Sequence, residues 1–346
     1  MTETHTDVAP SGMAQDQTIN VFVITYKATH LLPKCLPNLL NSTIKARIIV
    51  VNSSSNDGTV EMAQEMGAET FVVPRKSFNH ALTRELARRT FPSDIAVMVT
   101  PDAFPTGPDV IEKLTAPIRE GKAAVSYARQ IPHVGAGFFE AFPREFNYPA
   151  VNEIRSIEDL KRYGAYTFYC SNSCSAWRNS ALDAVGGFGV SLVSEDFIGV
   201  AKLLRNGEKV AYVGDAVVHH SHTYTLKQEF QRMFDTGYER YWQRHLLLDG
   251  VSEDARGKLF VKAMIARLWK ERPVAIPYAI VQTGAKYIGY KLGFAAHKLP
   301  KSWIPKISSQ DFYWGSEAFQ KREAVEWNWD LAATPSPAST GRPGSA

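Results

Sequence analysis

Short apolar runs alternate with amphipathic segments over about the first 130 residues of the chain. The runs are rich in β-branched and aromatic residues and are typical of strands, whereas the segments between them repeat their apolar residues at helical spacing. Strands are predicted at residues 19–25, 46–52, 70–74, 95–100 and 123–127, and helices at 31–40, 58–66, 79–89 and 110–116. This order predicts an α/β fold with a Rossmann-like, doubly wound sheet, whose ligands bind beyond the carboxyl ends of the strands.

The regular alternation then stops. Residues 135–169 are predicted to form an aromatic-rich connection, a candidate cover for an acceptor site, and an apolar run at 210–218 predicts one more strand. Residues 226–248 have the spacing of one long helix. The predicted parts of the chain are a disordered N-terminus at 1–17, the α/β domain at 18–245, a basic helical C-terminal region at 246–331 and a disordered tail at 332–346.

Length and composition limit the class of protein. A chain of 346 residues with 45% hydrophobic residues can bury an α/β core and still carry a smaller appendage. Its three cysteines, Cys35, Cys170 and Cys174, are an odd and sparse set that fits a reducing, cytoplasmic compartment. The N-terminus lacks the pattern of a secretion signal, and no run of about 18 apolar residues predicts a membrane span. The glycine fingerprints of dinucleotide-binding and P-loop proteins are also missing.

The net charge of +4 is unevenly distributed. Residues 256–306 contain eleven Lys or Arg residues and a single acid, Glu271. Large apolar residues are interleaved with these cations, namely Leu259, Phe260, Ile265, Trp269, Tyr287, Tyr290, Trp303 and Ile304. The pattern favours an anionic membrane surface or a lipid diphosphate as neighbour, and it fits a solvated helical subdomain equally well. We expect no nucleic-acid partner.

Polar residues follow the second and fourth predicted strands, at the edge where ligands are expected. Asn52 opens a polar turn that continues to Asp57, whose carboxylate either caps the next helix or faces a ligand. Asp102 follows the fourth strand as a lone carboxylate and is either a ligand-binding group or a turn residue. His80 and Arg84 lie four residues apart, on one face of a predicted helix that either meets a diphosphate or faces solvent.

Two later clusters contain acid–base and metal-binding side chains. Glu195 and Asp196 follow a glycine turn, where a carboxylate can act as a general base or simply belong to a helix N-terminus. His219, His220 and His222 follow the last predicted strand, and alternation places the second and third of them on one face. Two neutral imidazoles at that position either bind a divalent metal or have a structural role.

The order of these signals along the chain resembles the family 2 inverting glycosyltransferases, which have the GT-A type of nucleotide-diphospho-sugar transferase fold. The resemblance covers about residues 19–240 and is greatest to bacterial rhamnosyltransferases of cell-surface polysaccharide assembly. It is carried by Thr25-Tyr26, Asn52, Asp57-Gly58-Thr59, Arg84, Asp102, Glu195-Asp196 and His220-Ser221-His222. The rhamnosyltransferase branch is indicated by Phe78-Asn79-His80, Thr83-Arg84, Tyr127-Ala128-Arg129-Gln130, Phe146-Asn147-Tyr148-Pro149, Ser171-Asn172, Phe234-Asp235, Gly237, Gly289-Tyr290-Lys291-Leu292-Gly293 and Tyr313-Trp314.

The resemblance implies a set of residues that bind the nucleotide-sugar donor. They are Thr25, Tyr26, Asn52, Asp57, Arg84 and Asp102. The first three would contact the base and the ribose. The family usually has an aspartate at the position of Asn52, and the amide oxygen of Asn52 can still accept a hydrogen bond from a pyrimidine ring. Arg84 would add positive charge beside the diphosphate.

The resemblance also implies a metal site and a catalytic base. Of the two aspartates that the family usually places around one residue, this chain keeps the second, Asp102. Asp102, with His220 or His222, would bind Mg²⁺ or Mn²⁺ against the diphosphate, where the ion stabilises the leaving group. Asp196 would remove the proton from the acceptor hydroxyl, with Glu195 in support, and a single displacement would invert the anomeric centre.

The implied function is transfer of L-rhamnose from dTDP-L-rhamnose onto a growing, lipid-linked bacterial surface glycan. We expect a cytoplasmic enzyme that attaches peripherally to the inner face of the cell membrane. One alternative is the same mechanism with another nucleotide sugar. The other is a catalytically silent protein that binds glycans or nucleotides.

Overall fold

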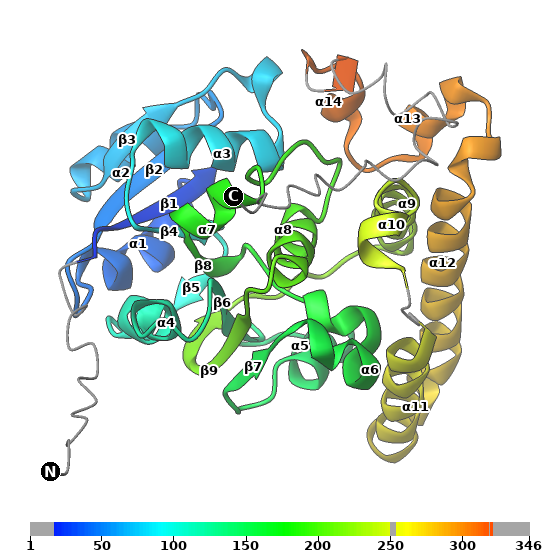
Figure 1. Cartoon of the computed structure of the whole chain (residues 1–346). Helices are drawn as coiled ribbons and strands as arrows, with labels where there is room; N and C mark the ends of the chain where they lie inside the picture. The colour runs from blue at the N-terminus through cyan, green and yellow to red at the C-terminus, as the bar shows by residue number, and fades with distance from the viewer. Residues whose placement is uncertain (1–16, 250–253, 318, 321–346) are drawn as a thin grey trace, which may run out of the picture.

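The computed structural model describes residues 17–249, 254–317 and 319–320, and in them it shows a curled, mixed sheet of nine strands with helices on both faces (Figure 1). The order of paired strands is β3-β2-β1-β4-β8-β6-β9-β5, and β7 pairs with β9. The strands are β1 (Ile19–Thr25), β2 (Arg47–Asn52), β3 (Glu69–Val72), β4 (Ile95–Val99), β5 (Phe104–Pro105), β6 (Val125–Ile131), β7 (Glu153–Arg155), β8 (Cys174–Arg178) and β9 (Val210–His219). The helices are α1 (Leu32–Leu40), α2 (Thr59–Glu65), α3 (His80–Thr90), α4 (Val110–Arg119), α5 (Phe138–Asn147), α6 (Leu160–Tyr163), α7 (Asn179–Ala184), α8 (Glu195–Arg205), α9 (Leu226–Trp242), α10 (Arg244–Leu247), α11 (Asp254–Glu271), α12 (Ile276–Phe294), α13 (Ile304–Ile307) and α14 (Asp311–Trp314).

The sheet has a parallel half and a mixed half. β1 pairs in parallel with β2 and β4, and β2 pairs in parallel with β3, as the alternating pattern predicts. β8, a strand that the sequence did not predict, interrupts the parallel order and lies antiparallel between β4 and β6. The long connection before it allows the chain to return in either direction. The reversal brings residues 171–173 beside the carboxyl end of β4.

Both faces of the sheet are covered, so its central strands are almost entirely apolar. On β1, Phe22 and Ile24 belong to one hydrophobic cluster, and Val21 and Val23 belong to the cluster on the opposite face. Residues of α3 and α8 contribute to the first cluster, and residues of α1 and α4 to the second. The predicted Rossmann-like α/β fold with a helical C-terminal region is therefore confirmed, and the carboxyl ends of β1, β2 and β4 lie along one edge.

The aromatic-rich connection predicted at 135–169 contains a helix, α5, which the sequence did not predict. Phe138, Phe142 and Phe146 are four residues apart and share one face of this helix. The Phe142 ring lies 5.2 Å from the ring of Phe260 in α11, measured between centroids. Pro143 lies inside α5 and removes one backbone hydrogen bond, a loss that this aromatic packing offsets.

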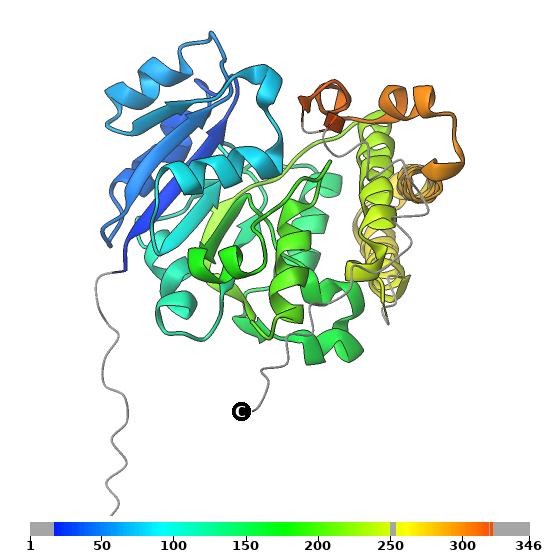
Figure 2. The ribbon, with the colours of Figure 1, turned by 45° about the horizontal axis from the view of Figure 1, so that its top comes forward.

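The C-terminal region is attached through α9 and α12, which lie side by side (Figures 1 and 2). Glycines occur at their contact. A Cβ atom at Gly237 would collide with the carbonyl oxygen of Tyr290, and one at Gly293 would collide with that of Phe234. Gly289 and Gly293 lie four residues apart, so α12 turns a glycine face toward α9. The two backbones therefore approach as closely as hydrogen side chains allow.

A small hydrophobic cluster completes this attachment. Phe234 and Tyr238 of α9 are buried against Ile304, Tyr313 and Trp314 of the C-terminal region. The long helix predicted at 226–248 ends earlier, at residue 242, and α10 follows it. The predicted domain boundary near residue 245 stays a prediction. The helix α9 precedes this boundary, yet it packs against α12, which follows it. Across the described residues, no helix is both long and apolar enough to cross a membrane.

Replacing Gly293 by Ala should destabilise the protein, because the added methyl group collides with the backbone of Phe234. We expect the free energy of unfolding to fall by about 1–3 kcal/mol, despite the better helix propensity of alanine. Gly284 lies on the same helix with open space at its Cβ position, so Gly284→Ala is the matched control and should be neutral or stabilise by up to about 1 kcal/mol. Urea unfolding measures both. Equal stability of the Gly293→Ala variant and the wild type would contradict such close packing.

Candidate active site

A polar cavity of about 420 Å³ opens at the carboxyl end of β4. It gathers seven residues that the sequence analysis singled out as candidates. They are His80, Arg84, Asp102, Glu195, Asp196, His220 and His222. These side chains come from α3, the turn after β4, the first turn of α8 and the segment after β9. The topology therefore brings four distant segments to one place.

Asp102, His220 and His222 form a compact group of metal-ligating atoms. The Nε2 atoms of both histidines lie 3.5 Å from Oδ2 of Asp102. Pairing of the short β5 with β9, with Phe104 opposite His219, brings the two segments together. One carboxylate oxygen and two imidazole nitrogens can hold a divalent cation and leave further positions for phosphate oxygens.

Hydrogen bonds around His220 prepare its Nε2 atom to bind a cation. Arg144 donates to Oε1 of Gln130 at 2.8 Å, so this oxygen is an acceptor. Nδ1 of His220 lies 2.9 Å from the same oxygen and therefore carries the proton. Burial lowers the pKa of His220, which leaves Nε2 with a lone pair that faces the Asp102 carboxylate. Two acceptor atoms that face each other are stabilised by a cation between them, so the residues fit a metal ion.

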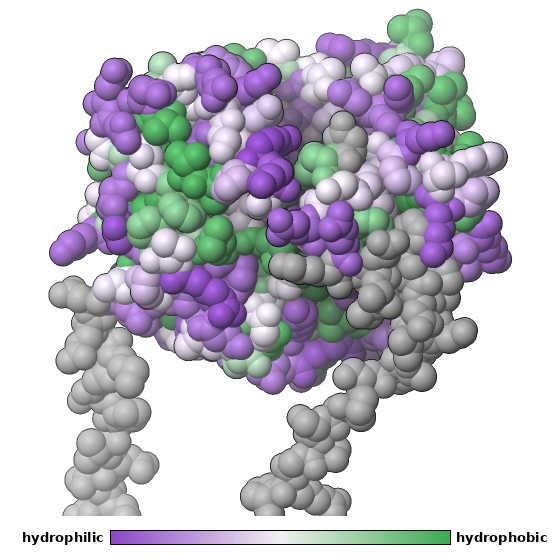
Figure 3. Space-filling model, turned by 90° about the horizontal axis from the view of Figure 1, so that it is seen from above, coloured by the Kyte–Doolittle hydropathy of each residue, from purple (hydrophilic) through white to green (hydrophobic). Residues whose placement is uncertain are grey.

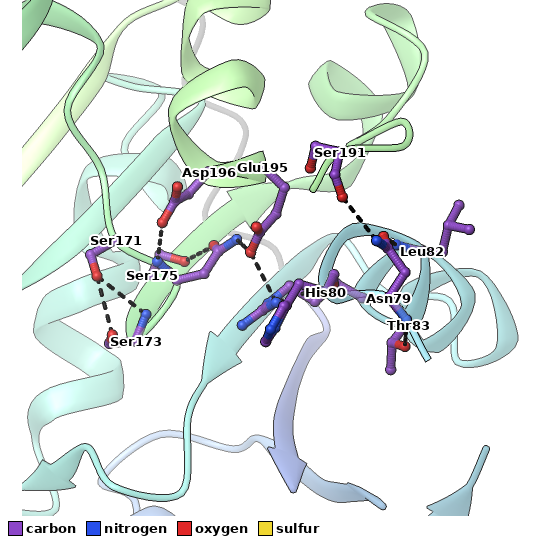
Figure 4. A network of polar contacts seen from close by, with 12 residues as sticks. Asn79, His80, Leu82, Thr83, Ser171, Ser173, Ser175, Ser191, Glu195 and Asp196 are labelled. Carbon is purple, nitrogen blue, oxygen red and sulfur yellow. Dashed lines mark hydrogen bonds and ion pairs between the residues drawn. The ribbon is translucent and has the colours of Figure 1, made fainter. Parts of the chain in front are cut away.

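Glu195 is buried and held by structural partners (Figure 4). Its carboxylate lies 2.9 Å from the guanidinium of Arg84 and accepts a hydrogen bond from Nδ2 of Asn172 at 3.1 Å. Burial opposes the charge of Glu195, but Arg84 and the other favourable contacts, among them the Asn172 hydrogen bond, together outweigh burial and lower the pKa of the carboxyl group. The solvent-facing alternative for Arg84 is wrong, because that residue is only 3% exposed. The helix that begins with Glu195 is thereby fixed to α3.

Asp196 faces the cavity from the same helical turn (Figure 4). Its Oδ2 accepts the backbone N–H of Asn172 at 2.9 Å, and its Oδ1 accepts that of Phe197 at 2.8 Å. Burial and the negative charge of Glu195 raise the pKa of Asp196 to about 6. Ser194, just before the pair, has a left-handed φ of 64°, a conformation that costs energy for a residue with a side chain. A carboxylate with a raised pKa is well suited to accept a proton near neutral pH.

The residues predicted to contact the base and ribose lie outside this lining. Thr25 and Asn52 end the neighbouring strands β1 and β2, and Nδ2 of Asn52 lies 3.2 Å from the Thr25 hydroxyl. The Asn52 side chain is fully buried, and its oxygen accepts the backbone N–H of Ser55 at 2.9 Å. Tyr26 is 42% exposed, and the Arg75 guanidinium lies 4.0 Å from the centre of its ring. Their role in nucleotide binding stays a prediction.

Asp57 ties the loop after β1 to the start of α2. The cap alternative is wrong, because Gly58 is the capping residue and no side chain caps this helix. Instead, the Asp57 carboxylate accepts hydrogen bonds from the hydroxyls of Thr29 at 3.2 Å and Thr59 at 2.7 Å. Burial opposes the charge, but these bonds outweigh it and lower the pKa of Asp57.

The lining of the cavity also contains residues that the sequence did not predict. Arg144 of α5 and Arg232 of α9 line it, together with Ser309 and Gln310 from the C-terminal region. The backbone N–H and the hydroxyl of Ser309 both donate to the Asp235 carboxylate of α9, at 2.9 and 2.5 Å. Asp235 belongs to a motif of the rhamnosyltransferase branch, and this motif was the available sequence signal that the residue matters. Only the fold shows that this carboxylate holds a distant segment against the site.

A Rossmann-like sheet whose edge combines metal-ligating side chains with a carboxylate of raised pKa is typical of nucleotide-sugar glycosyltransferases. Residues 16–238 match the family model described as "Glycosyltransferase like family 2". The chain belongs to this family and is a glycosyltransferase. The alternative of a catalytically silent binding protein is therefore set aside.

Two curated proteins are similar over most of their length. The chain is 34% identical over 312 residues to the O-antigen chain rhamnosyltransferase RfbN of Salmonella typhimurium, covering 89% of this chain and 99% of that protein. It is also 34% identical over 283 residues to the O-antigen chain rhamnosyltransferase WbaN of Salmonella anatum, covering 81% and 90%. A solved structure of the mannosyltransferase PcManGT from Pyrobaculum calidifontis, in complex with GDP-Man and Mn²⁺, superposes with a TM-score of 0.52 at 18% identity, covering 94% of this chain and 90% of that one. This likeness supports the fold.

Donor turnover should fall at acid pH with an apparent pKa of about 6, because only the ionised Asp196 accepts a proton. Activity should be complete above that pH and should drop about tenfold for each pH unit below it. Glu195→Gln removes the neighbouring negative charge and should shift this acid limb to lower pH. Release of nucleoside diphosphate measured from pH 4 to 9 gives both profiles. An acid limb that stays in place in Glu195→Gln would show that Glu195 does not tune the base.

Proposed function

We propose that this glycosyltransferase moves L-rhamnose from dTDP-L-rhamnose onto a growing, lipid-linked surface glycan and inverts the anomeric configuration. The observation that carries the proposal is the similarity to two O-antigen chain rhamnosyltransferases over most of both chains. The cavity supports the same chemistry, since it combines one carboxylate suited to proton transfer with separate groups suited to a diphosphate.

Asp196 acts as the general base of this reaction. It takes the proton from the acceptor hydroxyl while that oxygen forms a bond to the anomeric carbon of the donor. The bond from the anomeric carbon to the diphosphate oxygen breaks on the opposite face in the same step, so the configuration inverts. The backbone N–H groups of Asn172 and Phe197 keep the carboxylate in position, and Glu195 keeps its proton affinity raised.

Asp102, His220 and His222 would hold Mg²⁺ or Mn²⁺, which supplies positive charge for the leaving nucleoside diphosphate when it is bound. Gln130 holds His220 in the tautomer that directs Nε2 toward Asp102. Arg84 adds positive charge at the cavity wall, although part of that charge is neutralised by Glu195 in the same wall.

The nucleotide is assigned to the ends of β1 and β2. Tyr26 offers an exposed aromatic ring to the base, and the cationic Arg75 lies over that ring. Thr25 and Asn52 form the floor beneath, through their mutual hydrogen bond. Asp57 orders the loop after β1 and so shapes this part of the donor site.

The enzyme is further proposed to work at the cytoplasmic face of the membrane, with its C-terminal helices on the lipid surface. Trp269 and Ile280 are 73% and 62% exposed, and they lie within the strongly basic segment 256–306. Hydrophobic residues are also seen at the upper right edge of Figure 3, on the side of α12 and α13, and a broader group lies on the left. Anionic headgroups complement the cations, while exposed apolar side chains can enter the interface.

The donor assignment is tested by slow hydrolysis of nucleotide sugars, with release of nucleoside diphosphate as the readout. We expect release from dTDP-L-rhamnose with Mg²⁺ or Mn²⁺ and none with EDTA. His220→Ala should weaken activation by the metal at least about tenfold. His219→Ala is the matched control, because that histidine bonds to the Pro132 carbonyl oxygen outside the ligand group, and it should keep the wild-type metal dependence. Release from a different sugar would disprove the rhamnose assignment and leave the mechanism standing.

Membrane attachment is tested by co-sedimentation with lipid vesicles. The wild type should bind vesicles that contain phosphatidylglycerol and should dissociate as salt is raised, because the contact is partly electrostatic. A Trp269→Gln, Ile280→Gln variant should bind several-fold more weakly. Val72→Gln, which changes an exposed apolar residue on β3, is the control and should bind like the wild type. Equal binding of all three proteins would exclude this surface.

A further inference from the structure

A second cavity of about 420 Å³ lies next to the active site. Tyr169 lines both cavities, and Phe197, the residue directly after the base Asp196, lines the second one. Arg240 and Arg256 are also in its wall. Within the described part of the chain, no Asp or Glu side chain belongs to the lining. Aromatic rings and cations without carboxylates favour a ligand that carries negative charge next to an apolar or sugar surface.

Arg256 is the residue in this wall best prepared to bind an anion. Its guanidinium lies 3.5 Å from the centre of the Tyr166 ring and 5.3 Å from that of Phe146, so its plane is held by aromatic contacts. Its polar contact among the described residues is the neutral amide oxygen of Asn147, at 3.1 Å. The Nε atom is buried and has no acceptor in the described part of the chain. A guanidinium fixed in this way presents its positive charge to the cavity that it lines.

The rest of the lining of the second cavity also combines cations with aromatic rings. The Arg240 guanidinium lies 3.5 Å from the centre of the Phe197 ring, and Tyr166 and Tyr169 stack with centroids 5.0 Å apart. Lys286 adds a third cation, which forms an ion pair with Glu229 at 3.0 Å. Flat aromatic faces of this kind pack well against sugar rings or hydrocarbon.

We propose that this second cavity binds the acceptor, with an acceptor phosphate group against Arg256 and the adjoining sugar or hydrocarbon against the tyrosine rings. The proposal rests on the proposed function, since it assumes that the hydroxyl deprotonated by Asp196 belongs to a phosphate-bearing acceptor. The donor diphosphate is assigned to the Asp102 side of the first cavity. Tyr169 lines both cavities and Phe197 directly follows Asp196, so an acceptor in the second cavity would lie close to the base and could extend its reactive end toward it.

Binding can be measured apart from catalysis by calorimetric titration of the full chain carrying Asp102→Ala, in EDTA, so that the metal-dependent diphosphate site does not contribute. The probes are glucose 1-phosphate, which is a sugar phosphate without lipid, and geranyl diphosphate, which is a lipid diphosphate without sugar. We expect at least one probe to bind, and Arg256→Gln to weaken its binding about tenfold or more. Lys258→Gln is the matched control, because this exposed cation of α11 lies outside the lining, and it should leave probe binding unchanged.

The comparison of probes identifies the source of the phosphate. Tighter binding of geranyl diphosphate points to the lipid linkage, and tighter binding of glucose 1-phosphate points to the glycan. Arg256→Lys keeps the charge but loses the planar fork, so its affinity should be intermediate, which also covers the case in which Arg256→Gln fails to fold. No binding of either probe, or equal binding by the Arg256 and Lys258 variants, would overturn the proposal. Donor hydrolysis by the wild type tests the proposed function separately.

Discussion

A buried ion pair between Arg84 and Glu195 fixes the geometry of the active site. Arg84 lies on α3, Glu195 begins α8, and both side chains are almost completely buried. Loss of one partner would leave an unpaired buried charge, which typically costs about 3–5 kcal/mol. Because Asp196 directly follows Glu195, the pair positions this proposed base and also keeps a negative charge beside it, which contributes to the raised pKa of Asp196. The Arg84–Glu195 ion pair therefore affects both the position and the proton affinity of Asp196.

The features that were predicted from the sequence are those that depend on local residue patterns. The strands β1, β2 and β4 were placed within one residue of their observed ends, and the rule that ligands bind beyond the carboxyl ends of strands pointed to Asp102. The strand β8 was not predicted, because its five residues, Cys174–Arg178, form no β-branched apolar run and follow a long connection. The orientation of His220 was equally out of reach, because it depends on Gln130, 90 residues away. Such polar contacts follow only once the topology is known.

The C-terminal region takes part in the active site although it lies outside the α/β sheet. Asp235 of α9 holds Ser309, and the adjoining Gln310 lines the cavity. Arg232 reaches the same wall from α9 itself. The proposed base and the candidate metal ligands thus belong to the α/β part, whereas the lining residues Arg232, Ser309 and Gln310 depend on how α9 and the C-terminal region are packed. Residues that shape one cavity are therefore contributed by segments that sequence patterns assign to separate parts of the protein.

The glycine contact between α9 and α12 has a consequence for dissecting the enzyme. A chain shortened to end near residue 245 would keep the sheet, Asp102 and Asp196, and would look like a minimal catalytic unit. It would also uncover Phe234 and Tyr238, together with the flat, side-chain-free surface around Gly237. Exposed apolar grooves of this kind promote self-association. Aggregation of such a fragment would therefore be a poor guide to whether its chemistry is intact, and supplying residues 254–317 in trans is the more informative way to divide the protein.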